Sequence, residues 1–544
     1  MTPPRWVPLA VFTAALALRL AHVQQVAAHD PFYDQPSVDS LVYGDWARQI
    51  AGGDWLGSEP FFLSPLYGYF LGALYAMFGP SFLAPLVANA LFGAATCALI
   101  YAIARRLFDW RAGLAAAALF ALYRMEIFYE GAALLEALQT LLTTAVAWSA
   151  LAALARPSFA RFAGAGALLG LAVLGRENTL LFAPAFAAWS WLALRARLPA
   201  AGRRAALAGA YLGATALLVL PATLRNWVVA HDLVLVNSTG GIVLYTGWNP
   251  EANGAYMVPS LFPRALADDP VEQKNAYRVL AEQRVGRPLR ASEVSSYWRG
   301  EALAWIAAQP RAALALGLEK ARLFWNAFEA WDIRSVTLAR GTSWVLRTAF
   351  VSFGILAPLA LAGVALTLAR WRELVPLYLV VALQFATAVT FIVLSRYRVP
   401  AVPALAVFAG AGAIALFDLA RGRRWPRLAL GSAVLAAAAF LVNFRVPPED
   451  LSMAHFNLGN AYKERGQFGP AVEEYFASLE TAPGYISTWN NLALVYERSG
   501  ADRETTLRVW QRVLDLARAQ GSQLHAERAQ RHLNALSAPA APPQ

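Results

Sequence analysis

The chain has 544 residues, of which 58% are hydrophobic and only 15% are charged. Soluble proteins carry about 45–50% apolar and about 25% charged residues, so this composition excludes a set of ordinary soluble domains. The net charge of +11 comes mainly from arginines in short links between apolar stretches, which is typical of membrane topology and not of nucleic-acid binding. A single cysteine, Cys97, excludes an intrachain disulfide and a thiolate metal cluster.

Eleven apolar stretches in the sequence predict helices that cross a membrane. The first has no small-residue cleavage site after it, so we expect an uncleaved anchor. In chain order the stretches are Trp6–Val26, Ser81–Ala104, Ala112–Met125, Gly131–Ala155, Phe162–Gly175, Thr179–Leu194, Ala206–Leu224, Ser343–Ala369, Leu374–Leu394, Val399–Leu419 and Leu428–Phe444.

The orientation follows from the arginines in the links. Five links hold fifteen arginines and only two acidic residues, whereas residues 28–60 hold six acidic residues and one arginine. Because basic links stay in the cytoplasm, we expect a cytoplasmic N-terminus and outer loops at 28–80 and 225–342. Phe61–Phe78 is expected to lie along the outer surface, because a crossing there would turn the next arginines outward. The sequence thus predicts a multi-pass membrane protein.

The large outer loop contains two predicted amphipathic helices, Ala291–Ala307 and Arg311–Phe328. They follow a turn-rich part, Asn237–Asn253, in which Gly and Asn occupy turn positions. The helices carry aromatic residues and few charges, so we expect Trp298, Trp305, Phe324 and Trp325 to anchor them at the membrane surface.

Acidic residues at the outer ends of the spans are the first candidates for a functional site. Asp39 stands at the start of a short amphipathic helix and has Tyr43 on the same face; it either caps the helix or does chemistry. Glu136 lies about one turn inside the fourth predicted span, where a carboxylate must be paired, protonated or liganded. A structural hydrogen bond between helices is as good an explanation for Glu136 as a substrate contact. Glu130, at the start of that helix, is its rival.

Arginines at the outer ends of the spans are the second set of candidates, because the positive-inside rule does not explain them. They occur in three places: Arg176 in a short outward link, Arg225 with Asn226 at the end of the seventh span, and Arg396 with Arg398 in another outward link. An anionic ligand at the outer interface explains all three, since guanidinium groups bind phosphate bidentately. Reaching out to lipid headgroups, or pairing with a nearby glutamate, is the alternative for each one alone.

Beyond Pro447 the composition becomes that of a soluble helical module. Leu458, Gly459 and Tyr462 recur 34 residues later as Leu492, Ala493 and Tyr496. This period resembles a pair of tetratricopeptide repeats, and a generic helical hairpin is the alternative. We therefore expect an all-α chain with three parts: a polytopic membrane domain at 1–445, a repeat domain at 446–537 and a disordered tail at 538–544.

Taken in order, several short motifs of the first 444 residues resemble the GT-C fold glycosyltransferases that use lipid-phosphate sugars. The likeness is to bacterial members of the protein-mannosyltransferase and aminoarabinose-transferase type. The motifs are Asp39 with Tyr43 and Ala47, Gly53-Asp54-Trp55, Ser64-Pro65-Leu66-Tyr67, Ala104-Arg105-Arg106-Leu107, Glu130-Gly131 to Glu136, Leu224-Arg225-Asn226-Trp227 and Ser395-Arg396-Tyr397-Arg398-Val399-Pro400. The resemblance implies that Asp39 is the catalytic base and that Glu136, rather than Glu130, is the second acidic residue.

This resemblance implies an inverting enzyme at the outer face of the bacterial inner membrane. It moves a sugar from a polyprenyl-phosphate donor to a hydroxyl acceptor, which is a protein, a lipid or a glycan. Tyr43 and the outer arginines are then expected to contact the substrates. No histidine–carboxylate cluster has ligand spacing, so a metal is not indicated, although Asp39 and Glu136 together are able to hold one. The alternatives are a non-enzymatic scaffold that recruits periplasmic partners through its repeats, and a transporter.

Overall fold

The computed structural model describes residues 4, 6–36, 38–262, 270–331 and 334–537. Over these residues the secondary structure is helical, with one isolated bridge between Tyr123 and Val351 and no strand. The expected all-α class is confirmed. The chain forms two compact units. The first contains residues 1–28, 38–332 and 340–446, and the second contains residues 29–37, 333–339 and 447–544.

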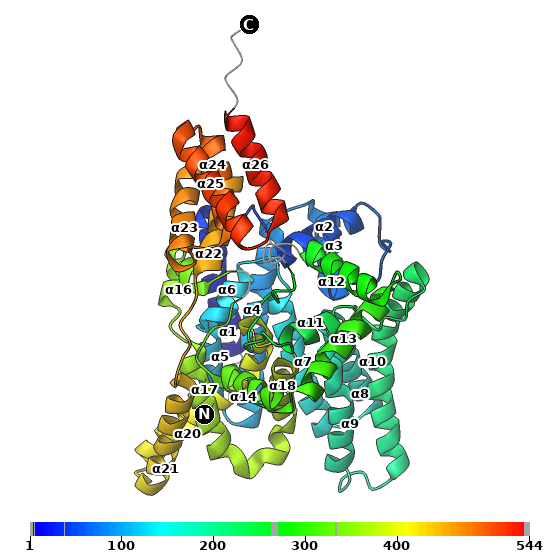
Figure 1. Cartoon of the computed structure of the whole chain (residues 1–544). Coiled ribbons are helices and arrows are strands. Elements are labelled where there is room, and N and C mark those ends of the chain that lie inside the picture. The colour runs from blue at the N-terminus through cyan, green and yellow to red at the C-terminus, as the bar shows by residue number, and fades with distance from the viewer. Residues whose placement is uncertain (1–3, 5, 37, 263–269, 332–333, 538–544) are drawn as a thin grey trace. The chain divides into compact units, whose positions relative to one another are not determined.

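Helices make up most of the first unit (Figure 1). As far as residue 230 the helices are α1 (Val7–His29), α2 (Asp39–Ala51), α3 (Pro65–Phe78), α4 (Leu83–Leu107), α5 (Trp110–Ala121), α6 (Arg124–Glu130), α7 (Glu136–Ala155), α8 (Phe159–Gly175), α9 (Phe182–Ala193) and α10 (Ala201–Ala230). Those that follow are α11 (Gly240–Gly247), α12 (Pro270–Val285), α13 (Ala291–Ala308), α14 (Pro310–Trp325), α15 (Val336–Thr342), α16 (Trp344–Thr348), α17 (Phe353–Thr367), α18 (Trp371–Thr390), α19 (Ser395–Arg398), α20 (Val402–Arg421) and α21 (Trp425–Asn443).

Seven helical stretches among the described residues are long and apolar enough to cross a membrane. One of them, Phe353–Thr390, contains both α17 and α18. Helices are present at all eleven predicted positions, but α5, α8 and α9 have only 12 to 17 residues. By the length and composition of these helices, the chain is a multi-pass membrane protein. The predicted total of eleven crossings stays a prediction. Helix α3, with 14 residues, extends about 21 Å, less than the hydrocarbon core of a bilayer.

Small residues let the helices of the first unit approach one another closely. At the crossing of α17 and α20, a Cβ added to Gly363 would lie 1.9 Å from the carbonyl oxygen of Phe408. At the crossing of α8 and α10, a Cβ added to Gly166 would lie 2.1 Å from the carbonyl oxygen of Tyr211. Such backbone contacts replace the hydrophobic effect, which does not drive helices together inside a bilayer.

The outer loop folds into its own small helical layer. The two predicted amphipathic helices are present as α13 and α14. Two further helices were not predicted: α12, and α11 in the turn-rich part. Trp298 and Phe324 were predicted to anchor these helices at the membrane surface. This is wrong, because both side chains are fully buried in the protein. Trp298 packs edge-on against Tyr277 of α12, with ring centroids 5.0 Å apart, and its indole nitrogen donates to the Tyr277 carbonyl at 3.0 Å.

Paired helices form most of the second unit: α22 (Ser452–Glu464), α23 (Phe468–Thr481), α24 (Ile486–Ser499), α25 (Arg503–Ala519) and α26 (Gln523–Ser537). The first and third of these begin 34 residues apart, at Ser452 and Ile486. Their shared core includes Tyr475 and Trp510, which are both fully buried. The predicted disordered tail, 538–544, lies outside the described residues.

Two short segments of the outer loops also belong to the second unit. Asp30 is buried and pairs with Arg334, and Asp34 pairs with Arg465 of the helical pairs at 2.6 Å. Glu449 accepts a hydrogen bond from Ser335 at 2.5 Å. The second unit is therefore built from three separate stretches of sequence.

Candidate functional site

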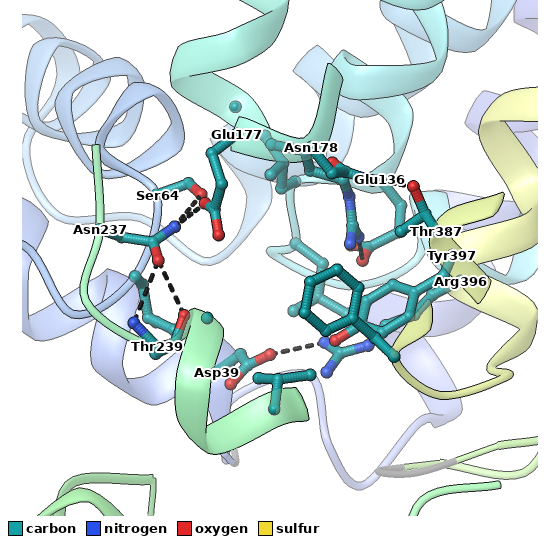
Figure 2. A pocket seen from close by; sticks show the side chains of 18 of the residues that line it. Asp39, Ser64, Glu136, Glu177, Asn178, Asn237, Thr239, Thr387, Arg396 and Tyr397 are labelled. Atoms are coloured by element: carbon teal, nitrogen blue, oxygen red, sulfur yellow. Dashed lines mark hydrogen bonds and ion pairs between the residues drawn. The ribbon is translucent and has the colours of Figure 1, made fainter. Parts of the chain in front are cut away.

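A cavity in the first unit collects side chains from six parts of the chain (Figure 2). Its empty volume, mouth included, is about 880 Å³. Its lining comes from α2, the segment before α3, the start of α7, the link between α8 and α9, the segment leading into α11, and the region from α18 to α19. Five residues singled out from the sequence lie in this wall: Asp39, Tyr43, Glu136, Arg176 and Arg396.

Asp39 and Arg396 form an ion pair across the cavity. The distance from the Asp39 Oδ2 to the Arg396 Nη1 is 2.5 Å, and both side chains are largely buried. Asp39 is the first residue of α2, but the position before it is Val38 and no side chain caps the helix. The carboxylate is therefore not a helix cap: it faces the guanidinium (Figure 2).

Glu136 and Arg176 form a second ion pair, on another wall. The Arg176 Nη2 lies 2.6 Å from the Glu136 Oε1, and the guanidinium stacks over the ring of Tyr397 at 4.6 Å. Glu136 begins α7 and is almost fully buried, and its Oε2 has no hydrogen-bond partner among the described residues. Asp39 and Glu136 are thus each held by one arginine.

A third acidic residue, Glu177, lines the opposite wall and was not predicted as a site residue. Its carboxylate accepts a hydrogen bond from the side-chain amide of Asn237, which also donates to the Ser64 hydroxyl at 3.0 Å. The Asn237 side-chain oxygen in turn accepts from Thr239 at 2.8 Å (Figure 2). Burial raises the pKa of Glu177 above its ordinary value. Its position next to Arg176 in an outward link was the feature of the sequence that could have identified Glu177 as a site residue.

Tyr43 lies one helical turn after Asp39 on α2 and also lines the cavity. It is buried and packs edge-on against Tyr67, with ring centroids 5.2 Å apart. Burial raises the pKa of Tyr43, and the negative charges of Asp39 and Glu136 raise it further. The phenol therefore stays protonated and able to donate a hydrogen bond.

Arg225 and Asn226 do not line the cavity, and they hold the first outer loop in place. The Arg225 guanidinium donates to the backbone carbonyls of Glu59, at 2.5 Å, and Leu56. The Asn226 side chain accepts from the Phe61 backbone at 3.1 Å and donates to two carbonyls just beyond α10. Both residues fix the segment that leads to Ser64.

Arg398 and Glu130 also lie outside the cavity wall. The Arg398 guanidinium is buried, donates to the Asn326 carbonyl at 2.7 Å and pairs with Glu329 at 2.6 Å. Glu130 pairs with Arg19 of α1 at 2.9 Å, and both side chains are fully buried. A Cβ added to Gly93 of α4 would lie 1.8 Å from the Glu130 carboxylate, so this pair sits inside the helix packing.

Among the described residues, no group of three or more His, Cys, Asp and Glu side chains is arranged to hold a metal ion. Asp39 and Glu136, the two residues considered for such a role, are each paired with an arginine.

Residues 59–227 match the family model of dolichyl-phosphate-mannose–protein mannosyltransferases. The resemblance expected from the motifs is therefore confirmed over this segment, and the general class that it supports is a membrane glycosyltransferase. The segment includes Glu136, Arg176 and Glu177 of the cavity, whereas Asp39 and Arg396 lie outside it. No curated protein matches the sequence.

Two solved proteins have similar folds at low sequence identity. An oligosaccharyltransferase from Archaeoglobus fulgidus is 14% identical, with a TM-score of 0.46 over 83% of this chain and 58% of that one. ArnT from Cupriavidus metallidurans, solved bound to undecaprenyl phosphate, is 16% identical, with a TM-score of 0.42 over 94% of this chain and 81% of that one. The chain spans less than two thirds of the length of the archaeal enzyme.

Proposed function

We propose that this protein is an inverting glycosyltransferase that moves a sugar from a polyprenyl phosphate to an acceptor hydroxyl at the outer face of the bacterial inner membrane. The observation that carries the proposal is the arrangement of Asp39 and Glu136, each paired with an arginine, around one cavity of the first unit. The match of residues 59–227 to dolichyl-phosphate-mannose–protein mannosyltransferases supports a sugar donor linked to a lipid phosphate.

In the proposed reaction the acceptor oxygen attacks the anomeric carbon from the side opposite to the phosphate. The new bond joins that oxygen to the anomeric carbon, the bond from the carbon to the phosphate oxygen breaks, and the configuration inverts. The acceptor proton passes to a carboxylate, and the electron pair of the broken bond leaves with the phosphate. Such a leaving group needs positive charge more than it needs a proton donor.

Each cavity residue has a proposed role in that step. Asp39 is the general base, since it lies at the cavity wall and has an exposed fraction of 17%, enough to meet an acceptor. Arg396 and Arg176 meet the developing charge on the phosphate. Glu136 orients Arg176 through their ion pair, and Tyr43, one helical turn after Asp39, donates to a substrate oxygen.

Arg225, Asn226, Arg398 and Glu130 receive structural roles in this proposal, because their side chains bind protein groups away from the cavity. For the second unit we propose a pair of tetratricopeptide repeats on the outer side of the membrane that binds a protein partner. The helix spacing of 34 residues supports this, because stacked helical pairs of that period present a concave face.

The experiment that tests the function is sugar transfer by the purified full-length protein from radiolabelled polyprenyl-phosphate sugars to a periplasmic extract. Asp39→Asn is expected to lower the rate by roughly 100- to 10,000-fold, the usual contribution of a positioned general base. The matched control is Asp45→Asn on the same helix, since Asp45 is exposed and pairs only across the surface with Arg48. Equal rates of sugar transfer by Asp39→Asn and the wild type would contradict the assignment of Asp39 as the general base. No transfer from any lipid donor would favour a scaffold.

A further inference from the structure

A second cavity lies at the other end of the helices that line the first one. Helix α7 contributes Glu136 to the first cavity and Leu151 to Ala155 to the second. Helix α18 likewise contributes Thr387 to the first and Trp371 to the second. At 1.5 Å per residue, the two sites are about 25 Å apart along α7. The empty volume of the second cavity is about 1680 Å³, mouth included.

The lining of this second cavity carries an excess of positive charge. Five arginines and one glutamate contribute to it: Arg106, Arg195, Arg197, Arg370, Arg372 and Glu373. Glu373 is already paired with Arg370 at 2.6 Å, so the remaining four guanidinium groups have no acidic side chain in the lining to balance them.

Two of those four arginines are held by the protein. Arg197 donates to the carbonyls of Leu154 and Ala155 at the end of α7, both at 3.0 Å, and Arg106 donates to the Leu151 carbonyl at 3.1 Å. The Arg195 and Arg372 side chains have no hydrogen bond or ion pair within the described part of the chain. Arg372 has only a ring contact, with Trp371 at 5.5 Å. Two guanidinium groups are thus available to an anion from outside the protein.

The rest of the wall is apolar. Leu107, Leu151 and Leu192 lie in it, together with Trp189 and Trp371, whose rings are 5.7 Å apart. The indole nitrogen of Trp189 is buried and has no hydrogen-bond partner among the described residues. A soluble phosphate needs no wall of leucine and tryptophan, and a bare hydrocarbon chain needs no arginine. An amphiphile with a phosphate head matches both halves of the lining.

We propose that the second cavity is a binding site for a phosphate-bearing membrane lipid. Arg195 and Arg372 contact its phosphate, and its hydrocarbon chains lie against the leucine and tryptophan wall. The site is separate from the proposed sugar-transfer cavity and does not depend on that activity, because none of its residues lines the first cavity.

The test is lipid retention by the full-length protein, equilibrated with vesicles of phosphatidylglycerol mixed with phosphatidylcholine and then examined by native mass spectrometry. The double variant Arg195→Gln/Arg372→Gln is expected to bind phosphatidylglycerol about 100-fold more weakly, since it loses two charge-assisted contacts and each contributes about a factor of ten. Its melting temperature is expected to stay unchanged, because neither side chain bonds to the protein. The matched control, Arg424→Gln/Arg427→Gln, removes the same charge from the start of α21, outside the cavity.

Three outcomes would overturn the proposal. Equal losses in the double variant and its control would mean that the whole basic surface attracts the lipid. Equal retention of phosphatidylcholine and phosphatidylglycerol by the wild type would mean that only the apolar wall binds. Displacement of the lipid by millimolar inorganic phosphate would identify a soluble anion as the occupant.

Discussion

Two buried or half-buried ion pairs hold the charges of the first cavity. Removing one partner of such a pair leaves the other charged and poorly solvated, which costs about 3–5 kcal/mol at a fully buried site. Glu136 is almost fully buried, so it depends more strongly on its partner, Arg176. Substitutions of Arg176 therefore affect folding as well as ligand binding, whereas Asp39, which is more exposed than Glu136, is the cleaner position for a functional test.

Lys320 of α14 gives a stability prediction that depends on pH. Burial lowers the pKa of its ammonium group from 10.5 to about 7, while its Nζ donates to the Phe391 carbonyl at 2.6 Å. Between pH 7 and pH 10.5 the unfolded chain binds a proton at Lys320 that the folded chain does not, so this group makes stability rise with pH in that window. We expect the melting temperature of the wild type to rise between pH 7 and pH 9 relative to Lys320→Met. Parallel curves would contradict the lowered pKa.

The site residues were partly predictable because ionisable groups are costly at membrane depth. That argument selects Asp39, Glu136, Arg176 and Arg396, which line the cavity. It selects Arg225 and Arg398 just as strongly, yet these bind backbone carbonyls at Glu59 and Asn326. Those carbonyls come from segments distant in the sequence. A single sequence therefore shows that an arginine needs a partner and does not show which one it has.

At the scale of elements, the crossing of α17 and α20 gives a prediction from close packing. Gly363→Ala would place a methyl group 1.9 Å from the Phe408 carbonyl oxygen, so the two helices must move apart. We expect a loss of about 1–3 kcal/mol, seen as a lower melting temperature in detergent. Gly209→Ala in α10 is the control, because nothing lies within 4 Å of the added Cβ and alanine favours a helix. An equal effect at both positions would refute the packing argument.

The apolar helices were predictable because hydropathy reports directly on burial in lipid or protein. The outer loop was less predictable. The aromatic residues of α13 and α14 suit a membrane surface and a protein core equally well, and the structure buries Trp298 against Tyr277. Tyr277 belongs to α12, which carries many charges and no marked apolar face. Its role in covering Trp298 depends on tertiary packing that sequence periodicity does not contain.

At the scale of the whole molecule, the predicted orientation in the membrane can be tested by labelling introduced cysteines. Cys97 is fully buried, so the native chain supplies little background. In intact cells we expect a membrane-impermeant maleimide to label Ser58→Cys, in the acidic first loop, and not Arg424→Cys, in an arginine-rich link. Both positions are exposed in the structure, so accessibility to solvent is matched. Labelling of Arg424→Cys alone would reverse the orientation.

The division of the whole chain into two compact units is only partly predictable from composition. The change of composition at Pro447 coincides with the start of the main stretch of the second unit. The segments 29–37 and 333–339 join that unit through contacts such as Asp30 with Arg334. A truncation before Pro447 would leave these segments without the helices to which they belong, so activity tests require the full chain.

The contact between Asp39 and Arg396 also bears on the timing of catalysis. While the arginine is engaged, it occupies the Oδ2 of Asp39, so this oxygen is not free to meet the hydroxyl of an acceptor. A lipid phosphate that recruits Arg396 would release Asp39 at the moment when the leaving group is in position. We therefore expect compulsory ordering in initial-rate kinetics, with the donor first. In the proposed enzyme without donor, the ion pair would thus keep Asp39 from activating water or another alcohol before a sugar has arrived.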